Sequence, residues 1–159
     1  MRSTSKNEPA KKKKAKRKPP PLEIGWREWV SLPDLGVARI KAKIDTGAKS
    51  SALHAYQIEE FERDGKLYAA FDVHPVQRKK SPSIRCVAPI VDKRSVKSSN
   101  GAIELRIVIA TVLTLGPVSR EVEITLTNRD EMGFRLLIGR DSISRVAVIY
   151  PGKSFLLGK

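Results

Sequence analysis

The stretch ARIKAKIDTGAKSSAL, residues 38–53, holds the pattern on which the fold depends. Its first half alternates, because Ile40, Ala42 and Ile44 are apolar and the residues between them are basic. This alternation predicts a strand with one buried face. The strand leads directly into Asp45-Thr46-Gly47, and an acid, a hydroxyl and a glycine at a strand end place a carboxylate in a tight turn that another backbone can approach. The tripeptide occurs by chance in roughly a few per cent of chains of this length, so its meaning depends on the remaining sequence.

Length and charge indicate one folded domain with a basic extension. The 159 residues carry a net charge of +14, and residues 1–21 hold nine Lys or Arg against one Glu. This segment has almost nothing to bury and ends in three prolines, so we expect a disordered basic tail at 1–21 and a folded domain at 22–159. Several lysines on one flexible arm suit contact with nucleic acid or the ribosome, and a solvated extension without such a role is the alternative.

Cysteine content and hydropathy argue against secreted and membrane-spanning classes. The single cysteine, Cys86, excludes an intramolecular disulfide and fits a reducing compartment. No apolar run approaches about 20 residues, and no apolar segment follows the N-terminal charges as it does in a secretory signal. We therefore expect a cytoplasmic protein with no membrane contact.

The rest of the chain predicts strands and turns without long helices. Asp64-Gly65 and Asn100-Gly101 are hairpin signals, and turns recur about every 8–12 residues. Pro89 predicts an edge position for the strand that contains it, and Asp141 or Ser142 is expected to cap one short helical turn. Further strands are expected at 22–32, 67–73, 84–91, 103–115, 121–127, 134–138, 146–150 and 154–157. The pattern is that of an all-β barrel or sandwich with at most one short helix.

Two motifs together resemble the retropepsin-like aspartic proteases: DTGA at 45–48 and LLIGRD at 136–141. That family also has a glycine-containing hairpin, the flap, between the two motifs, and Ser98, Ser99, Asn100 and Gly101 lie where its tip is expected. More narrowly, the chain resembles a bacterial branch labelled ATP-dependent zinc proteases and associated with ATP-grasp ligases that add glutamate to proteins. The segments that carry this likeness are GWREW (25–29), KAKIDTGA (41–48), SALH (51–54), VKSSNG (96–101) and LTNRD (126–130). The resemblance covers about residues 23–158.

The resemblance implies a closed β-barrel of the retropepsin type and aspartic-type endopeptidase activity, with Asp45 as the catalytic residue. Peptide hydrolysis by carboxylates needs one group to deprotonate water and another to protonate the carbonyl oxygen. Two adjacent aspartates share one proton and supply both functions. Because the chain has a single Asp-Thr-Gly, the second carboxylate must come from a second copy of the chain, and a homodimer is expected.

The resemblance also implies roles for the neighbours of Asp45. Thr46 is expected to join the two active-site turns, while Gly47 and Ala48 line the cleft. Gly139 is expected to pack behind the active-site strand, and Arg140 to support the fold by ion pairing. The alternative for Asp45 is the common role of an aspartate that caps the amides of its own turn.

Lys49, followed by Ser50, departs from the many retropepsins that carry an acid after the DTGA motif. A cation there favours acidic peptides, so Lys49 and Ser50 are expected to bind substrate, and the association with ligases suggests glutamate-rich or glutamylated chains. Two alternatives stay open. The domain could bind acidic peptides without cleaving them, or the protein could act on ribosomes or RNA through its tail.

The zinc and ATP labels of that branch receive little support from the residues. A catalytic zinc needs about three protein ligands, and His54, His74 and Cys86 lack the spacing of a metal motif. No glycine-rich phosphate loop is present either. We therefore expect no metal and no cofactor.

Overall fold

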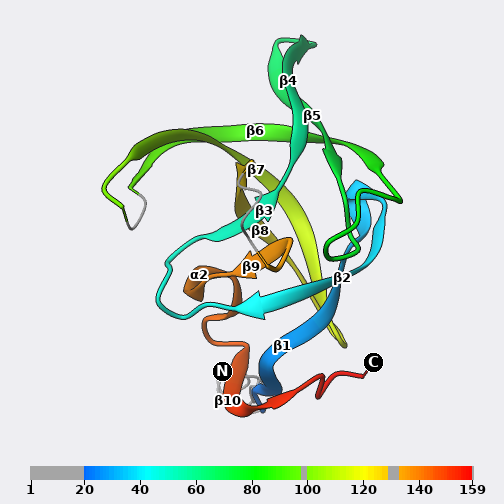
Figure 1. The fold of residues 1–159 in the computed structure, drawn as a ribbon, viewed down its shortest axis with the longest axis vertical. Helices are drawn as coiled ribbons and strands as arrows, with labels where there is room; N and C mark the ends of the chain where they lie inside the picture. The colour runs from blue at the N-terminus through cyan, green and yellow to red at the C-terminus, as the bar shows by residue number, and fades with distance from the viewer. Residues whose placement is uncertain (1–19, 98–99, 129–132, 159) are drawn as a thin grey trace, which may run out of the picture.

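The computed structural model describes residues 20–97, 100–128 and 133–158, and their fold is a ring of β-strands (Figure 1). The elements are β1 (Leu22–Leu32), the 3₁₀ helix η2 (Pro33–Leu35), β2 (Val37–Ile44), β3 (Ser51–His54), β4 (Tyr56–Arg63), β5 (Lys66–Val73), β6 (Ile84–Lys97), β7 (Ile103–Leu115), β8 (Val118–Thr127), β9 (Leu136–Ile138), α2 (Arg140–Ile143) and β10 (Ala147–Ser154). The all-β class and the single short α-helix of these described segments are confirmed, whereas the closed barrel stays a prediction.

One sheet contains every strand in the order β10-β1-β2-β9-β3-β8-β7-β6-β5-β4. A further pairing between Ser31 of β1 and Thr114 of β7 completes the ring. The β4–β5 hairpin projects away from this ring (Figure 1). No helix in the described segments is long and apolar enough to cross a membrane. Most of residues 1–21, the predicted tail, lies outside the described residues, so its disorder stays a prediction.

Strand β9 determines where the Asp-Thr-Gly turn lies. Strands β2 and β3 are consecutive in sequence, yet β9 lies between them, parallel to β2 and antiparallel to β3 (Figure 1). Ile44 is paired with Ile138, and Leu53 with Leu136. The connection 45–50 therefore passes the C-terminal end of β9, which brings the two predicted motifs into contact.

The alternation predicted for β2 is confirmed. Ile40, Ala42 and Ile44 are buried in the core, and Arg39 and Lys43 are exposed. The neighbouring β1 buries Val30 and Leu32 in the same core. The two tryptophans of β1, expected in the core or at an interface, are only half-buried, so the core position is wrong and the interface position stays a prediction.

Strand β1 also buries a charged residue, Glu28, which is 0% exposed. Its carboxylate accepts backbone N–H groups from Gly25 at 2.6 Å, Leu156 at 2.9 Å and Leu157 at 3.0 Å. A buried carboxylate is stable only when it is hydrogen-bonded in this way. Glu28 therefore joins the C-terminal segment to the first strand.

Several local predictions need correction. The segment 84–97 is one strand, and Pro89 is not at an edge of the sheet. It lies where β6 changes its pairing partner from β5 to β7, and a residue without a backbone N–H is tolerated at such a break in the hydrogen-bond ladder. Residues 151–154 belong to β10, and no strand follows them at 155–157. Gly139 is the N-cap of α2, with no side-chain cap bond, in place of Asp141 or Ser142.

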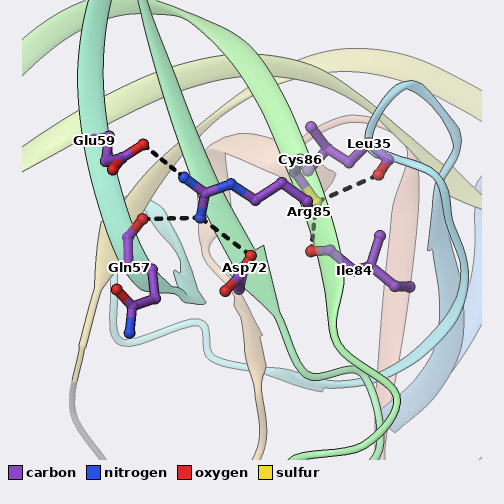
Figure 2. A network of polar contacts seen from close by, with 7 residues as sticks. All are labelled: Leu35, Gln57, Glu59, Asp72, Ile84, Arg85 and Cys86. Carbon is purple, nitrogen blue, oxygen red and sulfur yellow. Dashed lines mark hydrogen bonds and ion pairs between the residues drawn. The ribbon is translucent and has the colours of Figure 1, made fainter.

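Strand β6 is tied to its neighbours by Arg85 and Cys86 (Figure 2). Arg85 donates to Asp72 at 3.1 Å, to Glu59 at 2.9 Å and to the Gln57 carbonyl oxygen at 3.0 Å. The thiol of Cys86 is buried against the Leu35 carbonyl oxygen, 3.3 Å away. Burial raises the pKa of this thiol to about 11.

Candidate active site

Asp45 follows β2 directly and is held in a tight turn. Its N–H donates to the Ile138 carbonyl oxygen at 2.8 Å, and its own carbonyl oxygen accepts the Ala48 N–H at 3.2 Å. The Oδ1 atom accepts the Gly47 N–H at 3.2 Å. Asp45 thus caps its own turn, as the alternative for this residue predicted. Its other carboxylate oxygen has no hydrogen bond in the described part of the chain, and the side chain is half-buried, so this oxygen is available to water, substrate or a second copy.

Gly139 is the point of closest approach between the two motifs. A Cβ atom at this position would lie 2.5 Å from the backbone carbon and oxygen of Ser50 and 2.8 Å from the Lys49 carbonyl oxygen. No real side chain fits at these distances. The turn is held there by two further bonds, from the Arg140 N–H to the Ala48 carbonyl oxygen at 2.9 Å and from the Asp141 N–H to the Lys49 carbonyl oxygen at 3.0 Å.

The side chain of Arg140 contacts the Asp-Thr-Gly turn. Its guanidinium donates to the Thr46 carbonyl oxygen at 2.9 Å. This contact is a charge-assisted hydrogen bond to the backbone and not the ion pair that was expected for Arg140. Thr46 and Gly47 themselves are exposed at the surface of the single chain.

A pair of buried hydroxyls supports the turn and was missed in the sequence. The Oγ atoms of Ser51 and Ser142 lie 2.6 Å apart, and Ser51 Oγ also accepts the Gly139 N–H at 3.0 Å. Both serines are almost fully buried. No pattern in the sequence distinguishes them from the exposed serines nearby, because their pairing depends on the insertion of β9.

The predicted flap region is the end of the β6–β7 hairpin. Asn100 and Gly101 form its turn, in which Asn100 Oδ1 accepts the Ala102 N–H at 3.1 Å and Gly101 has φ +89°. Such a φ favours glycine. Ser98 and Ser99 lie outside the described residues. The function of this hairpin as a flap stays a prediction.

A groove of about 400 Å³ lies between the turn and this hairpin, and we call it the basic groove. The turn contributes Ala48, Lys49 and Ser50, and the hairpin contributes residues 94–97 and Arg106. Of the described residues that line the groove, four are cations, Lys49, Arg94, Lys97 and Arg106, and none is an acid. The three on the hairpin were missed in the sequence, although the alternation of β6 and β7 places Arg94 and Arg106 on one face.

These four cations differ in how far they are already neutralised. Arg94 donates to Glu123 at 2.6 Å and to Asp92 at 2.7 Å, and the Arg94 hydrogen bond lowers the pKa of Asp92. Arg106 donates to Glu104 at 2.8 Å. Lys49 and Lys97 form no ion pair among the described residues. The positive charge that the groove offers to a ligand is therefore mainly that of the two lysines.

The donor set for a zinc ion is not brought together by the fold. The described residues contain no group of three or more His, Cys, Asp or Glu side chains placed to hold a metal. His54 and His74 instead both contact Tyr56: the His74 ring stacks on it at 4.1 Å between centroids, and the His54 ring lies tilted against it at 4.7 Å.

An Asp-Thr-Gly turn packed against Gly-Arg, with β9 inserted between β2 and β3, defines a retropepsin-like protein. The chain belongs to the RimB-like family, described as retropepsin-like aspartic endopeptidase RimB, whose family model matches residues 23–159. It is also similar to a crystal structure of a protein of unknown function from Legionella pneumophila. That similarity has a TM-score of 0.73 at 32% identity and covers 86% of this chain and 98% of the other.

Curated relatives are much longer proteins. A protein of Shewanella halifaxensis named "Probable alpha-L-glutamate ligase" is 47% identical over 136 residues, which is 86% of this chain and 30% of the relative. A protein of Desulfotalea psychrophila with the same name is 44% identical over 136 residues, 29% of its length. The chain therefore spans about a third of the relatives that it matches.

Proposed function

We propose that the protein is an aspartic-type endopeptidase that acts as a homodimer on acidic or glutamylated protein chains. The observation that carries the proposal is the Asp45 turn, whose second carboxylate oxygen has no hydrogen bond among the described residues and which borders a groove with two unpaired lysines. Membership of a retropepsin-like family supports the reaction type. In this proposal the ring of strands is the closed barrel of that class, and the hairpin at Asn100 and Gly101 is its flap.

In the proposed reaction two copies of Asp45 face one another and share one proton. The ionised carboxylate takes a proton from water, whose oxygen attacks the peptide carbonyl carbon, while the protonated carboxylate gives its proton to the carbonyl oxygen. Collapse of the resulting diol breaks the C–N bond and returns a proton to the leaving amine. Gly47 and Ala48 would line the cleft, and Thr46 would join the two turns.

The substrate class is inferred from charge. Lys49 from the turn and Lys97 from the hairpin lie on opposite sides of the basic groove, and both lack a carboxylate partner in the described segments. Carboxylates of a glutamate-rich chain would supply those partners. The names of the longer relatives, which refer to a glutamate ligase, agree with a substrate that carries added glutamate.

Incubation of the purified full chain with a peptide that ends in several glutamates tests the proposal, with mass spectrometry of the products. Asp45→Asn should abolish cleavage while leaving folding intact, and Asp64→Asn in an exposed hairpin turn is the matched control. Sedimentation should give a dimer under the assay conditions. A monomer with full activity, or an Asp45→Asn variant that still cleaves, would refute the proposal.

A second candidate is an acidic-peptide-binding protein without catalysis. The basic groove favours it, because Asp45 is not among the residues that line the groove. Whether the protein is a peptidase or only a binding protein, the double variant Lys49→Gln and Lys97→Gln should weaken peptide binding at least tenfold. The double variant Lys66→Gln and Lys153→Gln removes the same charge elsewhere and is the control. Binding without cleavage by the unaltered chain would select this second candidate.

A further inference from the structure

The outer face of β1 and β2 carries aromatic rings interleaved with cations. Trp29 is paired with Lys41 across the two strands and stacks on Phe155, with ring centroids 6.1 Å apart. The Arg39 guanidinium lies 4.0 Å from the Trp29 ring centroid, and the Lys41 ammonium lies 5.2 Å from it. The Arg27 guanidinium lies 4.6 Å from the Trp26 ring and 4.9 Å from the Phe155 ring. Cation–π contacts hold these positive groups at fixed places on the face.

Two hollows lie next to one another here. The first, of about 590 Å³, is lined by Trp29, Arg39, Lys41 and the segment 75–78. The second, of about 530 Å³, is lined by aromatic and basic groups that include Tyr56, His74, Lys80 and Arg135. Arg78 lines both, so the two hollows form one continuous surface, which we call the basic–aromatic face.

No carboxylate among residues 20–97, 100–128 and 133–158 neutralises the positive charges of this face. Arg39, Lys41, Arg78, Lys80 and Arg135 form no ion pair among the described residues. Arg135 is only 7% exposed, and its contacts are to the hydroxyl of Tyr56 and the Lys79 carbonyl oxygen.

Among the described residues that line the two hollows, the one acid is Asp72, and it is already bound to Arg85 at 3.1 Å (Figure 2). Buried or clustered cations without carboxylates are costly unless a bound anion compensates them.

We propose that the basic–aromatic face binds single-stranded nucleic acid. A phosphodiester backbone supplies one anion per nucleotide along both hollows, and its bases can stack on guanidinium groups such as that of Arg39, which lies over the Trp29 ring. A small anion would occupy one hollow and leave the aromatic groups of the other without a function. In the described part of the chain, this face and the basic groove share no lining residue, so the proposal is independent of the peptidase reaction.

Fluorescence anisotropy of the full chain with labelled U12 RNA and dT12 DNA, measured at several salt concentrations, tests the proposal. Replacing Arg39, Arg78 and Lys80 with Gln should lower affinity at least tenfold. Loss of three phosphate contacts should also reduce the slope of log K against log salt by about 2, at about 0.7 per contact for single strands. Replacing Lys66, Arg120 and Arg145 with Gln removes the same charge elsewhere and should change affinity less than threefold. Equal affinities for RNA and DNA would mean that the face recognises only the phosphate backbone and the bases. Tighter binding of RNA would mean that it also contacts the 2′-hydroxyl.

Trp29→Leu separates stacking from charge. It removes the ring that holds the Arg39 guanidinium in place for a base. Binding should weaken about 5-fold to 150-fold, as expected for one lost base stack, with the salt slope unchanged and the folded circular dichroism spectrum retained. Equal losses in the face variant and the control variant would overturn the proposal, because binding would then depend only on overall charge and the tail. Displacement of U12 by millimolar inorganic phosphate would also overturn it, since the hollows would then hold small anions.

Discussion

Replacing Gly139 with alanine tests whether the close contact between the two motifs sets the position of Asp45. The added Cβ would lie 2.5 Å from the Ser50 carbonyl group, and ordinary contact needs about 3.4 Å. The connection 45–50 must therefore withdraw by about 0.9 Å. Such a shift lengthens the bonds from the Arg140 and Asp141 N–H groups beyond hydrogen-bonding range.

The magnitude follows from these two effects. Overpacking costs about 1–3 kcal/mol, and each lost hydrogen bond costs about 0.5–1.5 kcal/mol, so Gly139→Ala should lower the free energy of unfolding by about 3 kcal/mol. A displacement of this size at a reacting group can lower turnover about 100-fold. Urea denaturation followed by circular dichroism measures the first effect, and peptide cleavage by the folded fraction measures the second.

Gly152→Ala is the matched control, because no atom lies within 4 Å of the position of its added Cβ. It should change the free energy of unfolding by less than about 0.5 kcal/mol. If Gly139→Ala were as stable as this control, or if it were unstable but cleaved at the unaltered rate when folded, the link between the contact and the position of Asp45 would be refuted.

Three further outcomes follow from buried groups. Glu28→Gln leaves one of three buried N–H donors facing an amide NH₂ group. Thermal unfolding should therefore show that the free energy of unfolding falls by about 2–4 kcal/mol. The control Glu62→Gln, at an exposed position, should lower it by less than about 0.5 kcal/mol. The pKa of Cys86 is raised to about 11 by burial, so iodoacetamide at pH 8 should alkylate the native chain far more slowly than the urea-unfolded chain, and equal rates would contradict the burial. The pKa of His74 is lowered below 6.5, chiefly by burial and then by Arg135, so the unfolded chain binds its proton first as the pH falls. Stability should therefore decrease below about pH 6.5, and His74→Gln should reduce that decrease.

Local patterns predicted much of the fold, because periodicity reports which side of a strand is buried. The strand before Asp45, the hairpin turns and the long β7 strand are examples. Hydrophobicity does not predict burial in β1, where Trp26 and Trp29 are only half-buried and the charged Glu28 is buried. Glu28 is buried because backbone N–H groups 128 and 129 residues away converge on it, and sequence spacing carries no record of that convergence.

In the candidate site, too, local sequence patterns predicted some features, and others depend on contacts between distant segments. The two motifs and the hairpin turn were visible as local signals, whereas the groove cations and the Ser51–Ser142 pair depend on the insertion of β9 between β2 and β3. Arg140 was expected to form an ion pair, but its partner in the turn is the Thr46 carbonyl oxygen, because backbone geometry and not charge selects the acceptor there.

Strand β2 connects the two proposed surfaces, and their separation makes a last prediction. Lys41 belongs to the basic–aromatic face, and Asp45 follows four residues later, about 13 Å along the strand at about 3.3 Å per residue. At 0.15 M salt the Debye length is about 8 Å, so RNA on the face should leave the KM for an acidic peptide unchanged. At 0.01 M salt it is about 30 Å, so bound phosphates should weaken the attraction of the groove for the peptide and raise KM. The variant with Gln at Arg39, Arg78 and Lys80 should lose this rise. A rise in KM that persists in that variant would place the RNA in the basic groove.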